Sequence, residues 1–251
     1  MVAITDEGDD LIMQEIQSNS VRFLKLQLKN YGIFLGSNKI NFDRRRTLIV
    51  GMNGTGKTTI VNALANLGPA TGVKPNHQAM HSEMSVEVVT EGNRNLITKY
   101  GSLIFLYSEF PELNMPDNEN SLTYVFDQHQ LKAIKNEAKG IFQSVLSRNS
   151  GKMEANKDLN HNTMAAGEKV CLSYAYAFAV RKILTLDLPV VFDSPYARLD
   201  KWLGQGVCAF LREQPYQQII LGHKAEFEEE EKPHYILEYA DGYSRVVKND
   251  E

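Results

Sequence analysis

The fold follows from residues 47–58, which read Thr-Leu-Ile-Val-Gly-Met-Asn-Gly-Thr-Gly-Lys-Thr. Residues 48–50 have the apolar character of a buried strand, and residues 51–58 match the pattern G-x-x-x-x-G-K-[ST] at every fixed position. Glycines at this spacing let backbone N–H groups turn inward around phosphates, and the helix that follows adds its positive N-terminal end. This stretch therefore predicts a P-loop that binds a nucleoside triphosphate.

The P-loop pattern also predicts roles for single residues. We expect Lys57 to reach the β- and γ-phosphates and Thr58 to ligate Mg²⁺. An apolar helix face should follow, formed by Ile60, Val61, Leu64 and Leu67. The residues of this segment expected to contact the nucleotide are Gly51, Asn53, Gly54, Gly56, Lys57, Thr58 and Thr59.

The composition is that of a globular α/β protein with one large core, since 43% of its 251 residues are hydrophobic and 23% are charged. No apolar run is long enough to cross a bilayer, and the acidic start of the chain lacks the basic region of an export signal. The two cysteines, Cys171 and Cys208, have no metal-ligand spacing and are expected to be buried fillers. These features favour the reducing cytoplasm and no membrane partner.

The charge of the chain gives no general attraction for nucleic acid, because the net charge is −4 and the isoelectric point is near 5.9. Any DNA contact would have to be local. Arg44, Arg45 and Arg46 form a dense basic cluster, and residues 226–231 form its acidic counterpart. Both runs are interpreted as solvated surface rather than as recognition sites.

Hydrophobic patterning predicts an acidic N-terminal arm at residues 1–20 and a single head at residues 21–251. We expect the head to contain a P-loop lobe at about 21–110, a loop and helical insert at about 111–162, and a second lobe at about 163–251. Strands are predicted at residues 21–28, 40–42, 48–50, 84–89, 95–98, 103–106, 188–192 and 217–223, with a hairpin of residues 234–239 and 243–247. The three strands between 84 and 106 should form a mostly antiparallel side sheet, and helices are predicted at residues 130–146 and 167–186.

The strand at residues 188–192 brings Asp193 to its carboxyl end, where a parallel α/β sheet places ligand groups. An Asp at this point would hold the Mg²⁺ of the P-loop through its water shell, which makes Asp193 a Walker B candidate. Residues 194–200 then read Ser-Pro-Tyr-Ala-Arg-Leu-Asp. This run resembles the D-loop of ABC-type ATPases, in which Asp-x-Pro is followed by a short loop that ends in Leu-Asp.

About 25 residues upstream, Ala165-Ala166-Gly167-Glu168 opens a long helix, where ABC-type ATPases carry their signature motif. A turn of small residues at a helix N-terminus makes a second anion site, and in this family it approaches the γ-phosphate held by a partner subunit. His223 ends its strand about 30 residues after Asp193, where the family places its switch histidine.

These motifs occur in the family's order over residues 51–223, and the chain resembles an ABC ATPase head of the SMC/RecF/RecN superfamily. Residues 26–34, Leu-x-Leu-x-Asn-Tyr-Gly-x-Phe, are similar to the opening of SMC, RecF and DndD-like proteins, and residues 194–200 are similar to DndD-like and phage-defence members. The resemblance implies a mixed central sheet flanked by helices with an antiparallel side sheet. No long coiled coil is expected, because side strands and one modest helix take up most of the chain between P-loop and signature.

The same resemblance implies that ATP and Mg²⁺ are the cofactors and that two copies form a homodimer around two ATP molecules. It implies catalytic roles for Lys57, Asp193, Ser194 and His223, and nucleotide contacts from Ala165, Ala166, Gly167, Glu168 and Asp200. Such a dimer would act in DNA repair or antiviral defence and would gate a separate effector protein, a nuclease or a toxin. Tyr31, Phe34 and Tyr196 are expected to pack in the core or the dimer seam rather than stack on bases, and Arg198 is expected to cross the dimer interface.

Three positions depart from the family pattern. Ser194 stands where the family usually has a Glu that orients the attacking water, and a lost general base typically lowers the rate about 10²–10⁴-fold. Ala165 replaces the signature serine. The Q-loop residue is open among Gln128, Gln130 and the Tyr107-Ser108-Glu109 turn, and Gln128 is therefore also a candidate metal ligand.

Alternative functions follow from these departures. In one alternative, the change to Ser194 is neutral and Glu109 or His223 carries the chemistry. In another, the protein is a non-hydrolysing, ATP-dependent switch or scaffold. A P-loop GTPase or kinase is disfavoured, since Asn156-Lys157-Asp158 places its Asp one residue too early for the guanine motif Asn-Lys-x-Asp. A transporter subunit is disfavoured because those proteins usually carry Asp-Glu-Pro at the Walker B position.

Overall fold

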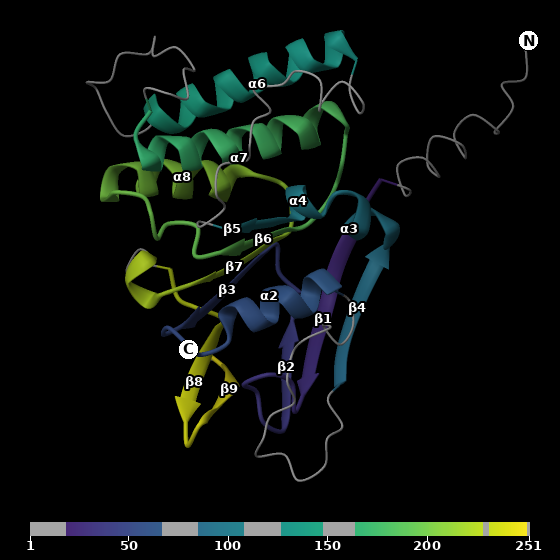
Figure 1. The fold of residues 1–251 in the computed structure, drawn as a ribbon, viewed down its shortest axis with the longest axis vertical. Coiled ribbons are helices and arrows are strands. Elements are labelled where there is room, and N and C mark those ends of the chain that lie inside the picture. Colours follow the sequence, from purple (N-terminus) through teal and green to yellow (C-terminus); the bar gives the residue numbers. More distant parts are fainter. Residues whose placement is uncertain (1–18, 67–84, 108–126, 148–163, 228–230, 250–251) are drawn as a thin grey trace, which may run out of the picture.

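The computed structural model describes residues 19–66, 85–107, 127–147, 164–227 and 231–249 (Figure 1). Some residues named above lie outside these ranges: most of the predicted arm, Leu67, Ser108, Glu109 and the Asn156-Lys157-Asp158 run.

A six-stranded mixed sheet forms the centre of the molecule, with the strand order β5-β6-β7-β3-β8-β9. Its strands are β3 (Arg46–Gly51), β5 (Phe105–Tyr107), β6 (Val190–Asp193), β7 (Gln218–Gly222), β8 (Tyr235–Ala240) and β9 (Tyr243–Lys248). The first five strands in that order run parallel, and only β9 runs antiparallel to its neighbour. Because parallel strands end at the same edge, the segments that follow β5, β6, β7 and β3 come together there.

A second, three-stranded sheet is antiparallel and has the order β2-β1-β4. Its strands are β1 (Val21–Lys29), β2 (Ser37–Asn41) and β4 (Ser85–Gly92). Strand β1 alternates between buried and exposed positions, as expected for a strand with one face on the core. The α/β class, the mixed central sheet and the antiparallel side sheet are therefore confirmed.

The central sheet lies between two helical layers (Figure 1). Helix α2 (Lys57–Asn66) packs on the face turned toward the side sheet, and α6 (Gln128–Ser147), α7 (Ala166–Ile183) and α8 (Lys201–Glu213) cover the other face. Alternate residues of one strand point to opposite faces, so Ile219 and Leu221 of β7 join the core around α2, whereas Ile220 joins the core beneath the three helices.

The predicted helices and the predicted C-terminal hairpin are present. Helices α6 and α7 match the predicted ranges to within a few residues. The hairpin of β8 and β9 turns at Asp241 and Gly242, whose φ values of 54° and 86° are those of a two-residue type I′ turn. Cys171 and Cys208 are buried as expected, and burial raises the pKa of the Cys171 thiol to about 12.

Two strand predictions are wrong. Residues 95–98 belong to a short helix, α3 (Asn95–Lys99), and residues 101–104 form α4 (Gly101–Ile104). Strand β5 follows and pairs in parallel with β6, so of the three predicted strands only β4 belongs to the side sheet. Such short apolar runs do not show whether a segment is helix or strand, because no full period is sampled.

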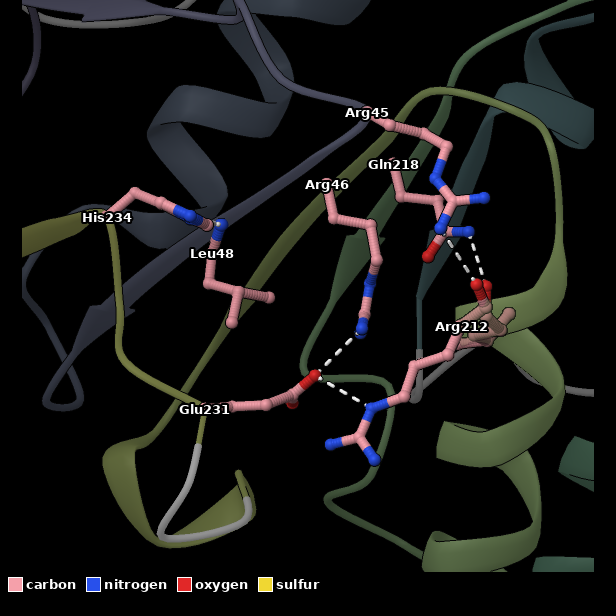
Figure 2. Close-up of polar contacts among 8 residues, drawn as sticks. Arg45, Arg46, Leu48, Arg212, Gln218, Glu231 and His234 are labelled. Atoms are coloured by element: carbon pink, nitrogen blue, oxygen red, sulfur yellow. Dashed lines mark hydrogen bonds and ion pairs between the residues drawn. The ribbon is translucent and has the colours of Figure 1, made fainter.

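The arginines before the P-loop strand are held by contacts within the chain (Figure 2). Arg46 Nη1 donates to Glu231 Oε1 at 2.8 Å, and Arg212 Nε donates to the same oxygen at 3.1 Å. Arg45 donates to the backbone carbonyls of Arg212 and Gln214, at the end of α8 where helix carbonyls lack partners. The sequence predicted solvated surface charges at both positions, and for Arg46 and Glu231 this prediction is wrong. Their ion pair joins β3, α8 and the segment before β8.

None of the helices in the described ranges is long and apolar enough to cross a membrane.

Candidate functional site

The candidate site lies at the edge where the parallel strands end. In the register of the sheet, Val50 of β3 lies opposite Gly222 of β7, and Leu221 of β7 lies opposite Asp193 of β6. Asp193 in turn lies opposite Tyr107, the last residue of β5. The P-loop, Asp193 and His223 therefore leave neighbouring strands side by side, although the sequence separates them by up to about 170 residues.

Lys57 is buried and points back over the start of the P-loop. Its Nζ donates to the carbonyl oxygens of Gly51 at 2.8 Å and Met52 at 3.0 Å. Burial lowers the pKa of Lys57, whereas the negative charges of Asp193 and Glu226 oppose this shift. The lysine thus lies where the P-loop pattern predicts, with a cationic group next to the backbone turn that would surround the phosphates.

The shape of the P-loop depends on the segment that follows β1. Gly56 has a φ of 96°, a backbone conformation that side chains with a Cβ rarely adopt. A Cβ at this position would approach the ring of Phe34 to 2.7 Å and Ile33 Cγ2 to 2.8 Å. Tyr31 and Phe34 are fully buried, so the prediction that these aromatics pack in the core is confirmed, and Phe34 supports the loop from behind.

The two residues expected to hold Mg²⁺, Thr58 and Asp193, are in direct contact. Thr58 Oγ1 donates to Asp193 Oδ2 at 2.8 Å. A hydroxyl and a carboxylate are oxygen ligands suited to Mg²⁺, which takes one or two protein ligands and completes its shell with phosphates and water. The described residues contain no group of three or more His, Cys, Asp and Glu side chains that could hold a metal. When bound, Mg²⁺ would neutralise charge on the phosphates.

The signature turn is built by its own residues. The backbone N–H of Ala165 donates to Glu168 Oε2 at 2.9 Å, and Glu168 is buried. A Cβ at Gly167 would approach Leu203 Cδ1 to 2.9 Å and the Arg198 carbonyl oxygen to 3.4 Å. The turn therefore packs against the D-loop and the start of α8, while Ala165 and Ala166 remain exposed at the N-terminus of α7.

The D-loop joins the Walker B strand to α8. Ser194 adopts a φ of 52°, donates its N–H to the Leu221 carbonyl at 2.7 Å, and brings its Oγ to 3.4 Å from Asp193 Oδ1. Asp200 Oδ1 accepts the N–H of Leu203 at 2.8 Å and so caps α8. Tyr196 is buried, as expected, whereas Arg198 is exposed.

One residue of this edge was missed by the sequence reasoning. Glu226 belongs to η2 (Lys224–Glu226), directly after His223, and its Oε1 accepts the backbone N–H of His223 at 3.1 Å. Burial raises the pKa of Glu226, and the His223 backbone N–H, His223 itself and Lys57 oppose this shift. The available signal was a Glu three residues after a strand-ending polar residue, the spacing of a capping box, but it was hidden in an acidic run.

The Q-loop candidates lie in different places. Tyr107 lies beside Asp193, and burial, with that carboxylate as a second cause, raises the pKa of its phenol. Gln130 exchanges hydrogen bonds with Asp127 at the start of α6, with its own N–H donating to Asp127 Oδ1 at 2.7 Å. Gln128 is exposed, and within the described ranges no hydrogen bond joins it to Thr58 or Asp193. The remaining expected nucleotide contacts, Asn53, Gly54 and Thr59, line the P-loop and the first turn of α2.

Comparison with known proteins agrees with this geometry. The AAA domain family matches residues 25–169, more than half of the chain. The SMC head domain from Thermotoga maritima has 17% sequence identity and a TM-score of 0.58, covering 92% of this chain and 100% of that one. An Smc head bound to the C-terminal winged-helix domain of ScpA has 18% identity and a TM-score of 0.60 over 90% and 98% of the two chains.

A third similar structure is the Smc head with an extended coiled coil, bound to the C-terminal domain of ScpA, from Pyrococcus furiosus. It has 14% identity and a TM-score of 0.61 over 91% of this chain and 96% of that one. No curated protein matches the sequence. These likenesses show an SMC-type head fold.

Proposed function

Since the chain belongs to the AAA domain family and has the fold of an SMC-type ATPase head, we propose that it binds Mg²⁺ and ATP and pairs with a second copy around two nucleotides. The observation that carries this proposal is the contact of Thr58 with Asp193 beside the buried Lys57. Two segments that match nucleotide-binding motifs, the P-loop and the strand that ends at Asp193, would supply the Mg²⁺ ligands and the cation for the phosphates at one edge.

Pairing of two copies is supported by how the signature turn is placed. Ala165 and Ala166 expose the N-terminus of α7, and Gly167 packs on the D-loop of the same chain. A helix N-terminus attracts anions, so this turn is suited to the γ-phosphate held by another copy. The D-loop residue Arg198 is exposed beside it and would lie at the seam.

The closed pair would act through a separate protein. One similar Smc head is bound to the winged-helix domain of ScpA, so a head of this shape can carry a partner on its surface. We propose that the partner here is an effector, a nuclease or a toxin, that ATP-driven pairing gates in DNA repair or antiphage defence in the cytoplasm. DNA would be contacted locally, because the net charge of −4 gives no general attraction.

The proposal is tested by measuring ATP affinity and oligomeric mass on the same samples, with and without Mg²⁺ and duplex DNA. Wild type should bind ATP and double in mass, and Lys57→Ala should lose both. Lys39→Ala, which removes an exposed lysine of β2, is the matched control and should leave both unchanged. Tight ATP binding by Lys57→Ala would contradict the site, and ATP binding without pairing would contradict the dimer.

A second candidate function is a pair that ATP holds together with little or no hydrolysis. Ser194 and Ala165 favour it, because a serine cannot act as a carboxylate base and an alanine removes one hydroxyl contact to the phosphate. Steady-state turnover separates the two functions, since both require ATP binding and pairing but only the first releases phosphate.

A further inference from the structure

We propose that Glu226 supplies the carboxylate that other ABC-type heads carry directly after the Walker B Asp, and that it activates the water that attacks the γ-phosphate. This inference rests on the ATPase proposed above. Ser194 occupies the usual position of that carboxylate, so the reaction needs another group at the same edge of the sheet.

The topology places Glu226 between the two halves of the nucleotide site. Strand β7 lies between β3, which leads into the P-loop, and β6, which ends at Asp193. The segment after β7 therefore leaves the edge between the P-loop and Asp193, and Glu226 is the fourth residue after Gly222. The mutual electrostatic influence of Glu226 and Lys57 agrees with this placement.

The two oxygens of the Glu226 side chain have different surroundings. Oε1 accepts the His223 N–H at 3.1 Å, which orients the carboxylate. Oε2 is buried and lies 3.2 Å from where a Cβ on Gly222 would be. The Tyr196 backbone N–H also acts on this carboxylate, opposing the rise of its pKa, so backbone donors after β7 and in the D-loop fix where it lies.

Three other carboxylates near the site, within the described residues, also accept hydrogen bonds. Asp193 accepts the hydroxyl of Thr58, Glu168 accepts the Ala165 N–H, and Asp200 accepts the Leu203 N–H. The hydroxyl of Ser194 lies 3.4 Å from Asp193 Oδ1. Glu226 differs from these carboxylates in its place, because it belongs to the segment that leaves β7 between the P-loop and Asp193.

Water can reach this carboxylate from the D-loop side. An open pocket of about 750 Å³ is lined by Glu226 and Phe227 together with Tyr196 and Asp200 of the D-loop. The pocket is large enough for many waters and has polar groups in its wall. Burial also raises the pKa of Glu226, which increases the proton affinity of a carboxylate that would act as a base.

The water oxygen forms a bond to the γ-phosphorus while the bond between that phosphorus and the oxygen bridging to the β-phosphate breaks. The bonding electron pair stays on the β-phosphate of the ADP product. The Glu226 carboxylate takes one proton of the water and later gives it to the phosphate product or to solvent, so the carboxylate is regenerated.

The test compares Glu226→Gln with wild type in steady-state phosphate release, ATP affinity and thermal unfolding. The amide keeps the acceptor for the His223 N–H but cannot take a proton. We expect turnover to fall about 10²–10⁴-fold, with ATP affinity and the unfolding midpoint close to wild type. Glu238→Gln, an exposed carboxylate of β8, is the matched control and should leave turnover unchanged.

A second variant provides a readout that a structural role would not move. Ser194→Glu added to Glu226→Gln places a carboxylate at the usual family position, and it should raise turnover of Glu226→Gln by about tenfold or more. If Glu226→Gln does not fold, Glu226→Asp takes its place. It keeps the charge but withdraws the carboxylate by one methylene, and a displacement of about 1 Å can lower the rate about 10²-fold.

Several outcomes overturn the inference. They are unchanged turnover in Glu226→Gln or in Glu226→Asp, an equal loss of turnover and ATP affinity, and no rescue by Ser194→Glu. Wild type without measurable turnover would also overturn it, yet ATP-dependent pairing in that sample would leave the proposed nucleotide-driven pairing intact. The failure of one proposal is thus distinguishable from the failure of the other.

Discussion

The candidate site has two halves whose contacts differ: the P-loop half, which contains Thr58 and Asp193, and the signature half, which contains Ala165 and Ala166. In the first half, Thr58 and Asp193 lie 135 residues apart in the sequence and meet at 2.8 Å within one chain. In the second half, Glu168 and Asp200 hold their own turns, and the small residues Ala165 and Ala166 face outward. In the proposed pairing, the first half is therefore the part that binds the nucleotide within one chain, and the second half is the part that meets the nucleotide of the other copy.

The largest expected effect is in the first half. Asp193→Asn keeps the size of the side chain but removes the charge that faces the Mg²⁺ site, and a bound metal provides several kcal/mol of charge stabilisation. Turnover should fall by about 10³-fold, measured as Mg²⁺-dependent phosphate release. The control Asp187→Asn alters an exposed Asp before the same strand and should have no effect. Retained turnover in Asp193→Asn would remove this residue from the metal site.

A second variant tests how the P-loop is supported. Gly56→Ala places a Cβ at a φ of 96° and within 2.7 Å of Phe34, and strain with overpacking should lower the free energy of unfolding by about 2–4 kcal/mol. Gly101→Ala is the matched control, because no atom lies within 4 Å of its added Cβ, and the change should be below about 0.5 kcal/mol. Denaturant unfolding measures both. Equal stability of the two variants would mean that Phe34 does not support the loop.

A third variant separates pairing from binding. Arg198→Ala alters an exposed D-loop residue, so it should weaken ATP-dependent pairing by about tenfold, or about 1.4 kcal/mol, and leave ATP affinity of the monomer unchanged. Sedimentation in the presence of ATP measures the pairing constant. Arg22→Ala on the side sheet is its control. Unchanged pairing would exclude Arg198 from the interface.

The smallest expected effect lies outside both halves. Gly140 is exposed in the middle of α6, and an added Cβ would meet no atom within 4 Å. Gly140→Ala should raise the free energy of unfolding by about 0.5–1 kcal/mol, because alanine loses less backbone freedom in a helix. ATP binding, turnover and pairing should all stay at the wild-type level. A change in pairing would mean that α6 also belongs to the interface between the two copies, so that pairing would not depend on the signature half alone.

Patterns that are long or chemically specific predicted the structure well. The P-loop and its helix, the strand that ends at Asp193, the helices α6 and α7, and the hairpin at Asp241 and Gly242 all carry their signal in neighbouring residues. Residues 95–106 do not, since apolar runs of two to four residues fit both a strand and a turn of helix. In this stretch, packing against the rest of the fold determines which residues form a helix and which form a strand.

The P-loop, the strand that ends at the Walker B candidate Asp193, and the order of motifs of an SMC-type head could be read from the sequence alone, because each motif depends on residues close together in the chain. The arrangement in space alone shows that Arg46 and Glu231 form an internal ion pair and that the Glu226 carboxylate accepts the backbone N–H of His223. In the sequence the arginine is a member of a basic run, and the two glutamates are members of an acidic run. Their burial and their partners exist only once β3, β7 and α8 lie side by side, since charge acts through distance in space rather than through position in the chain.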